Sequence, residues 1–144
     1  MRVAEILRAK GTEIYTAEPS MTLEEAARLM RSHRVGSLAV LGGDGRLVGL
    51  LNERDIVSAL ATHGAAATRL EVATAMQREL PSCDVADTIE GVMAKMTESR
   101  ARHLPVFDRM TFVGLLSIGD VVKGRLSELE QEARLVREYV TWGR

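Results

Sequence analysis

Two short segments share one order of residues: a glycine, two leucines, a polar residue and, three positions after the polar residue, an aspartate. They run Gly49-Leu50-Leu51-Asn52-Glu53-Arg54-Asp55 and Gly114-Leu115-Leu116-Ser117-Ile118-Gly119-Asp120, 65 positions apart. A carboxylate has lone pairs for two neighbouring hydroxyl groups, and charge-assisted hydrogen bonds of this kind are strong. The segments therefore predict two related ligand contacts, at Asp55 and Asp120.

A polar residue followed by an acidic residue three positions later is also typical of the N-terminal cap of a helix. The segments therefore have a structural interpretation as well as a ligand-binding one. Ser117 and Asn52 are good cap residues, and an acidic residue three positions later completes a capping arrangement. The first turn of a helix also favours anions. Repetition of the segment, with its flanking Gly-Leu-Leu, favours ligand binding, and one helix start can serve both purposes.

The rest of the chain repeats in step with these segments. Thr22 and Thr88 both precede an apolar 3.6-residue pattern, and Met30 and Met96 follow at the same interval of 66. Each repeat predicts strand, helix, strand, strand and helix, after a short helical turn. We therefore expect an α/β (α+β) fold of two β-α-β-β-α units. They should pack sheet to sheet in pseudo-two-fold symmetry and share a core, because neither repeat can bury much surface alone.

The repeats predict the domain boundaries. We expect a first unit with its N-terminal helix and linker at 1–68, a second unit at 69–125 and an amphipathic C-terminal helix at 126–144. The C-terminal segment has apolar residues spaced 3, 4, 3 and 4 apart, a heptad pattern. Two interpretations are open: the helix packs on its own unit, or it forms a dimer interface. The apolar positions are Leu126, Leu129, Ala133, Val136 and Val140.

Composition excludes several classes of protein. The net charge of −1 and an aromatic content of 3% argue against a nucleic-acid surface. A single cysteine, Cys83, leaves no internal disulfide and no multi-cysteine zinc site. The sequence has neither a signal segment nor an apolar run near 18 residues, so we expect a soluble cytoplasmic protein without a membrane partner.

Catalytic sites are not indicated, and we expect no enzyme activity, catalytic cofactor or metal. The histidines, His33, His63 and His103, lack a metal-ligand spacing. Ser117 has no evident base, and Cys83 has no basic neighbour. No phosphate-binding glycine motif of a nucleotide-hydrolysing or dinucleotide fold is present.

The repeated segments resemble a tandem pair of CBS domains, the module named after cystathionine β-synthase. The resemblance covers about residues 1–125. The family pattern has a hydroxyl residue three positions after the glycine and an aspartate three positions later, which Ser117 and Asp120 match. Asn52 replaces the usual hydroxyl in the first repeat. The residues that carry the resemblance are Arg34–Val40, Val48–Asp55, Arg102–Val106 and Val113–Asp120.

The resemblance implies a regulatory module that binds an adenosine-containing ligand in the cleft between its units. The expected ligands are AMP, ADP, ATP or NAD(H), with the ribose on Asp120 or Asp55. Such modules commonly form flat homodimers, and the short chain is similar to stand-alone bacterial signal-transduction members. A separate regulated protein would then read the signal.

Further contacts follow from matching positions in the two repeats. Thr16 and Ser82 lie in equivalent short strands, where family members touch the ligand. Pro105 breaks a strand hydrogen bond and so marks a sheet edge or a ligand-facing position. Cations for phosphate groups come from a short list, which is Arg54, Arg102, His103, Lys10 and Lys123.

Two other functions remain open. A protein-interaction scaffold with degenerate ligand sites would agree with Asn52 and with Gly119, the counterpart of Arg54. A binder of S-adenosylmethionine would use the same ribose chemistry without phosphate groups, which would leave the cations without a purpose.

Overall fold

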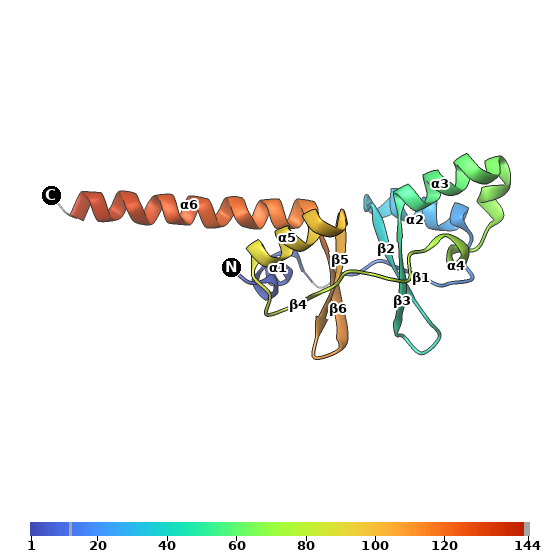
Figure 1. Ribbon diagram of the computed structural model, residues 1–144, viewed down its shortest axis with the longest axis horizontal. Coiled ribbons are helices and arrows are strands. Elements are labelled where there is room, and N and C mark those ends of the chain that lie inside the picture. The colour runs from blue at the N-terminus through green and yellow to red at the C-terminus, as the bar shows by residue number, and fades with distance from the viewer. Residues whose placement is uncertain (12, 143–144) are drawn as a thin grey trace. The chain divides into compact units, whose positions relative to one another are not determined.

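The computed structural model describes residues 1–11 and 13–142, and the predicted order of elements is present twice. Residues 13–80 form one compact unit (Figure 1). The unit contains β1 (Thr16–Ala17), α2 (Leu23–His33), β2 (Ser37–Leu41), β3 (Leu47–Asn52), α3 (Glu53–His63), the 3₁₀ turn η1 (Gly64–Arg69) and α4 (Val72–Ala75). Its sheet has the order β1-β2-β3, with β1 parallel and β3 antiparallel to β2.

The second compact unit joins the N-terminal residues to the chain from Pro81 onward. Its elements are α1 (Val3–Lys10), β4 (Cys83–Asp84), α5 (Ile89–Ser99), β5 (His103–Asp108), β6 (Thr111–Ser117) and α6 (Ile118–Trp142). The sheet order β4-β5-β6 repeats the first topology, with β4 parallel and β6 antiparallel to β5. The α/β (α+β) fold class and the C-terminal helix are confirmed.

The compact units do not follow the boundaries expected from the sequence, because the two opening helices are exchanged. Val3 and Ile6 of α1 are 0% and 7% exposed and lie in the core of the second repeat. Residues 69–80 pack on the first repeat, where Val72 and Met76 are buried. Amphipathic spacing predicts a buried face, but it does not specify which sheet covers that face.

Each unit contains its own cluster of buried side chains. One further expectation differs from the structure. The C-terminal helix does not begin at residue 126, because α6 runs without a break from Ile118 to Trp142. Helix formers continue past Lys123 without a proline, and Gly124 is held inside the helix by close packing on α1 and α5.

Pro105 lies in a central strand, so the expectation of a sheet edge is wrong. It is buried in β5 and stands opposite Leu115 of β6. Proline cannot donate a hydrogen bond towards β4. The parallel pairing of β4 accordingly begins at Cys83 opposite Val106, whereas Thr16 in the first sheet already pairs with Ala39.

The glycine of each repeated segment is a contact point for the exchanged helix. A Cβ atom on Gly49 would lie 2.7 Å from Met76 Sδ and 2.9 Å from the backbone oxygen of Gln77. The same atom on Gly114 would lie 3.2 Å from Leu7 Cδ2. The backbone of Gln77 also exchanges hydrogen bonds of 2.9 Å with Leu50 in both directions. Gly49 therefore allows close approach of the segment after α4.

Gly49→Ala is expected to lower the free energy of unfolding by about 1–3 kcal/mol, because the new methyl group meets backbone that cannot turn away. Gly114→Ala is the matched control and should cost less than about 1 kcal/mol, since the methyl groups of Leu7 can rotate. Urea unfolding followed by circular dichroism measures both values. Equal losses in the two variants would contradict the assigned difference between backbone and side-chain contact.

Candidate functional site

The turn from β6 into α6 positions Ser117 and Asp120. Ser117 N donates to Asp120 Oδ2 at 2.9 Å, and Asp120 N donates to Ser117 Oγ at 3.1 Å. The predicted cap is thus present as a reciprocal pair. His103, the first residue of β5, stands in register with Ser117, and Arg102 contributes its backbone oxygen to Ile118 N at 2.8 Å.

Lys10 reaches the same carboxylate from the end of α1. Its Nζ donates to Asp120 Oδ2 at 2.7 Å and to the backbone oxygen of Leu115 at 2.9 Å. The side chains of Lys10 and Asp120 are 35% and 22% exposed, so the ion pair is accessible to solvent. The exchange of the opening helices therefore supplies a cation to the repeat that has Gly119 in place of an arginine.

The surroundings of Asp120 favour its charged form. Burial acts to raise the pKa of this carboxyl group, but hydrogen bonds from Lys10 and from the backbone and side chain of Ser117 outweigh it. The pKa is consequently lower than the usual value.

A lowered pKa predicts that Asp120 stabilises the fold above its unfolded pKa, near 4, and that this contribution is lost as the pH falls through the folded pKa. Asp120→Asn keeps a side-chain oxygen as acceptor for Ser117 N but removes the charge. The difference in unfolding free energy between wild type and variant should therefore be largest near neutral pH and shrink below about pH 4. Urea unfolding across this range measures it, and a difference that grows in acid would contradict the assignment.

The first repeat has a different arrangement around its aspartate. Asp55 Oδ2 accepts from Asn52 N at 2.7 Å, and Asp55 Oδ1 accepts from Gln77 Nε2 at 3.1 Å. The residues have the capping-box arrangement, but Asn52 Oδ1 is buried and has no hydrogen-bond partner among the described residues. The same holds for Ser37 Oγ, which stands opposite Asn52 in the sheet.

The remaining predicted contact residues are not gathered around either aspartate by hydrogen bonds of the described structure. Arg54 is exposed on the first turn of α3, and Thr16 is exposed in β1. Ser82 precedes β4, and its backbone oxygen accepts from Lys95 Nζ at 2.6 Å. The resemblance implied a role for each residue, and their placement leaves that role a prediction.

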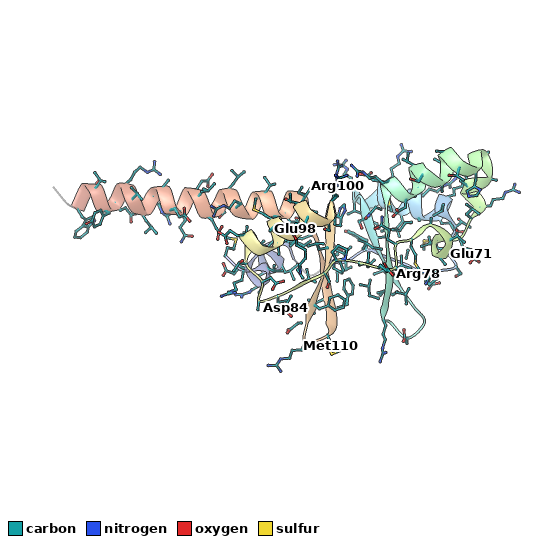
Figure 2. The ribbon with its side chains drawn as sticks, in the orientation of Figure 1. Glu71, Arg78, Asp84, Glu98, Arg100 and Met110 are labelled. Carbon is teal, nitrogen blue, oxygen red and sulfur yellow. The ribbon has the colours of Figure 1, made fainter. Side chains whose placement is uncertain are left out.

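Two surface pockets of the described structure are lined by neither Asp55 nor Asp120. One, of about 470 Å³, is lined by Ser82, Cys83, Asp84, Asp87, Lys95, Phe107 and Met110; Met110 is at the tip of the β5–β6 turn (Figure 2). The other, of about 500 Å³, is lined by Ala27, Met30, Arg31, Arg34, Val35, Gly36, Glu53, Ile56 and Val57. Among the predicted contact residues, Ser82 is the one that lines either of these pockets.

Two polar residues at the turn from Asn52 to Asp55 were not predicted from the sequence. Gln77 follows a helix of four residues, and its sequence offers no signal for contact with Asp55. Ser37 reads as the start of an apolar strand, although its hydroxyl group is buried next to Asn52. Only the pairing of β2 with β3 reveals this position.

The lone cysteine, Cys83, is buried. Burial raises the pKa of Cys83 to about 12, so its thiol stays protonated at neutral pH, as expected for a core cysteine. Residues 1–11 and 13–142 contain no group of three or more His, Cys, Asp or Glu side chains placed to hold a metal ion. Among the helices described, none is long and apolar enough to cross a membrane.

The chain is similar in sequence and in fold to known proteins. A family model described as CBS domain matches residues 3–62 and 71–127. The CBS domain-containing protein YhcV of Bacillus subtilis is 32% identical over 116 residues, covering 81% of each chain. The crystal structure of the CBS-domain containing protein ATU1752 from Agrobacterium tumefaciens is 37% identical, with a TM-score of 0.84 over 87% of this chain and 99% of that chain. The CBS domain pair of protein MJ0100, in complex with 5′-methylthioadenosine and S-adenosyl-L-methionine, shares the fold at 23% identity and a TM-score of 0.78, over 89% of this chain and 98% of that chain.

Proposed function

Since the chain belongs to the CBS-domain family and carries two CBS domains in tandem, we propose that it is a ligand sensor that binds an adenine nucleotide without turning it over. AMP, ADP, ATP and NAD(H) are the candidate ligands. A change in the bound state would be read by a separate regulated protein, in a cytoplasmic setting. Such a change requires that the ligand binds two states of the module with different affinity.

The observation that carries the proposal is the pairing of Asp120 with Lys10. Both anchoring bonds to the carboxylate end on Oδ2, from Ser117 N and from Lys10 Nζ. This fixes the carboxylate, and we assign Oδ1 to the hydroxyl groups of a ribose. The ammonium group beside it would face a phosphate, as would the N-terminal turn of α6.

The two repeats should bind with different strength. Each oxygen of Asp55 already accepts a hydrogen bond, one of them from the Gln77 amide. A ribose in the first repeat would have to displace that amide, whereas Arg54 offers an exposed cation for phosphate. We therefore propose a primary site at Ser117, Asp120 and Lys10 and a weaker one at Asn52 and Asp55.

Lys10 should also make the site bind a nucleotide more tightly than S-adenosylmethionine. The sulfonium group of S-adenosylmethionine carries a positive charge close to the ribose, where an ammonium group would repel it. A phosphate at the same place is attracted. The known complex of MJ0100 concerns that protein, and at 23% identity it supports the shared fold of this chain.

Thermal unfolding with a panel of ligands tests the proposal. The panel contains AMP, ADP, ATP, NAD, NADH, adenosine, S-adenosylmethionine and 5′-methylthioadenosine. A ligand at 100 times its Kd adds about 2.7 kcal/mol, which is about 5–10 °C at this chain length. We expect a shift with at least one phosphate-containing ligand, larger than the shift with adenosine.

Lys10→Met should abolish the preference for AMP over adenosine, while Lys123→Met, at an exposed lysine of α6, should keep it. If no ligand of the panel shifts the unfolding temperature, the proposal is wrong and the scaffold interpretation is favoured. A shift with S-adenosylmethionine alone would likewise overturn the assignment of a nucleotide.

A further inference from the structure

α6 carries a continuous apolar stripe that remains exposed. Its large side chains are between 43% exposed, at Leu129, and 62% exposed, at Val136. The positions are spaced 4, 3, 4, 3 and 4 apart, the heptad pattern of a helix that packs along a second helix. We call them the α6 stripe: Val122, Leu126, Leu129, Ala133, Val136 and Val140.

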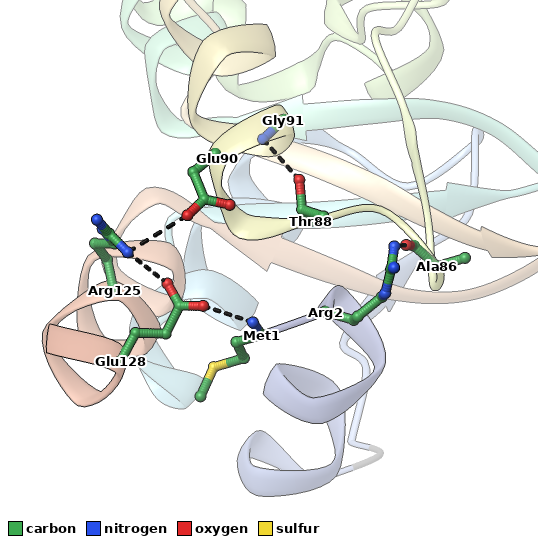
Figure 3. Close-up of polar contacts among 8 residues, drawn as sticks. All are labelled: Met1, Arg2, Ala86, Thr88, Glu90, Gly91, Arg125 and Glu128. Atoms are coloured by element: carbon green, nitrogen blue, oxygen red, sulfur yellow. Dashed lines mark hydrogen bonds and ion pairs between the residues drawn. The ribbon is translucent and has the colours of Figure 1, made fainter. Parts of the chain in front are cut away.

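A different side of α6 packs on its own unit. Val121 is 1% exposed, and a Cβ on Gly124 would lie 2.9 Å from Ile89 Cδ1 and 3.3 Å from Ile6 Cδ1. From the next turn, Glu128 accepts from the Met1 amino group at 2.5 Å and from Arg125 at 2.9 Å (Figure 3). Every described residue after Glu128 is exposed. Packing on the unit therefore fixes the base of α6 and leaves the stripe uncovered.

We propose that a second copy of this chain covers the α6 stripe, in a parallel two-stranded coiled coil. In parallel alignment, residues that flank the stripe face the flanking residues five positions later on the other helix. Glu132 of each copy then faces Arg137 of the other, and Arg125 faces Glu130. Each of these contacts joins opposite charges, and each occurs twice by symmetry.

The charges disfavour the reverse orientation. An antiparallel pair that buries the whole stripe sets Leu126 against Val136 and Leu129 against Ala133. The flanking contacts then bring Glu130 against Glu130, Glu132 against Glu132, and Lys123 against Arg137. All of these pairs carry like charges, so charge complementarity selects the parallel form.

The base of the helix makes this association favourable. The stripe spans Val122 to Val140, about 27 Å of helix, which is short for an isolated coiled coil. Because Val121, Gly124 and Arg125 already hold the helix in place, less conformational freedom is lost when two copies meet.

Sedimentation equilibrium of the full chain tests the interface with neighbouring substitutions. Val136→Lys places a charge in the stripe, and Leu135→Lys places the same charge beside it, at a side chain that is 56% exposed. We expect wild type and Leu135→Lys to self-associate alike and Val136→Lys to raise the Kd of this step at least tenfold. A monomeric wild type, or equal association of all three proteins, would overturn the proposal.

A cysteine at the end of the stripe tests the orientation. Val140→Cys brings two thiols together in a parallel pair, where oxidised glutathione should convert them to a disulfide between chains. The antiparallel form places each new cysteine beside Val122 of the other copy, about 27 Å from its counterpart. Wild type has only Cys83, which is 4% exposed, and should stay unlinked. Failure of Val140→Cys to form a covalent dimer would overturn the parallel arrangement.

Discussion

Asp120→Asn should weaken binding of an adenine nucleotide by about 10- to 100-fold. Hydrogen bonds to a charged group contribute about 1.5–3 kcal/mol, and each 1.4 kcal/mol corresponds to a factor of ten in Kd. The amide still offers an oxygen to Ser117 N, so the start of α6 stays capped. The loss should therefore come from the ligand contact, and not from local unfolding.

Asp55→Asn is the matched control for this result. Because Gln77 already engages Asp55, the substitution should change nucleotide affinity by less than Asp120→Asn does. Isothermal titration calorimetry of both variants measures the two values, with circular dichroism to confirm folding. A larger loss in Asp55→Asn would place the primary site in the first repeat, and unchanged binding in both variants would refute the assignment of either aspartate.

Ile6→Ala should lower the free energy of unfolding by about 2–4 kcal/mol, the range of a buried aliphatic truncation that leaves a cavity. Ile6 is 7% exposed and lies in the core cluster that contains Val92 and Leu104. Val57→Ala, at a side chain that is 65% exposed, is the control and should cost no more than about 0.5 kcal/mol.

Native-state hydrogen exchange can locate the effect of Ile6→Ala. Protection should fall in α5 and β5, because α1 belongs to their unit, while the amides of α2 and β2 keep theirs. The expectation from chain order alone is the opposite, since it assigns α1 to the first repeat. Loss of protection in β2 ahead of β5 would contradict the exchanged arrangement.

The sequence predicted what depends on local spacing. Ser117 caps α6 as expected, because Ser117 and its partner Asp120 lie three residues apart. The two hairpins and the two-fold repetition were predicted for the same reason. A short-range pattern is sufficient where both interacting groups belong to one turn of chain.

The sequence could not predict what depends on distant partners. Lys10 was a candidate cation, but nothing within 100 positions of it identifies Asp120 as its partner. The exchange of α1 and α4 was missed because either sheet could have covered an amphipathic helix. Pro105 was assigned to a sheet edge or a ligand-facing position because a proline removes a hydrogen bond between strands. The edge assignment was wrong because β4, the neighbouring strand, has only two residues and needs few such bonds.

The exchanged helices also bear on how such a chain could arise from a single repeat. A lone repeat would have an uncovered glycine on its sheet and an opening helix without a sheet to pack on. In two separate copies, the opening helix of each copy could pack on the sheet of the other, as in a domain-swapped dimer. When the two repeats are fused end to end, the exchange of helices becomes intramolecular. The linker then sets the effective concentration of one repeat near the other, and this concentration no longer depends on the amount of protein in the cell.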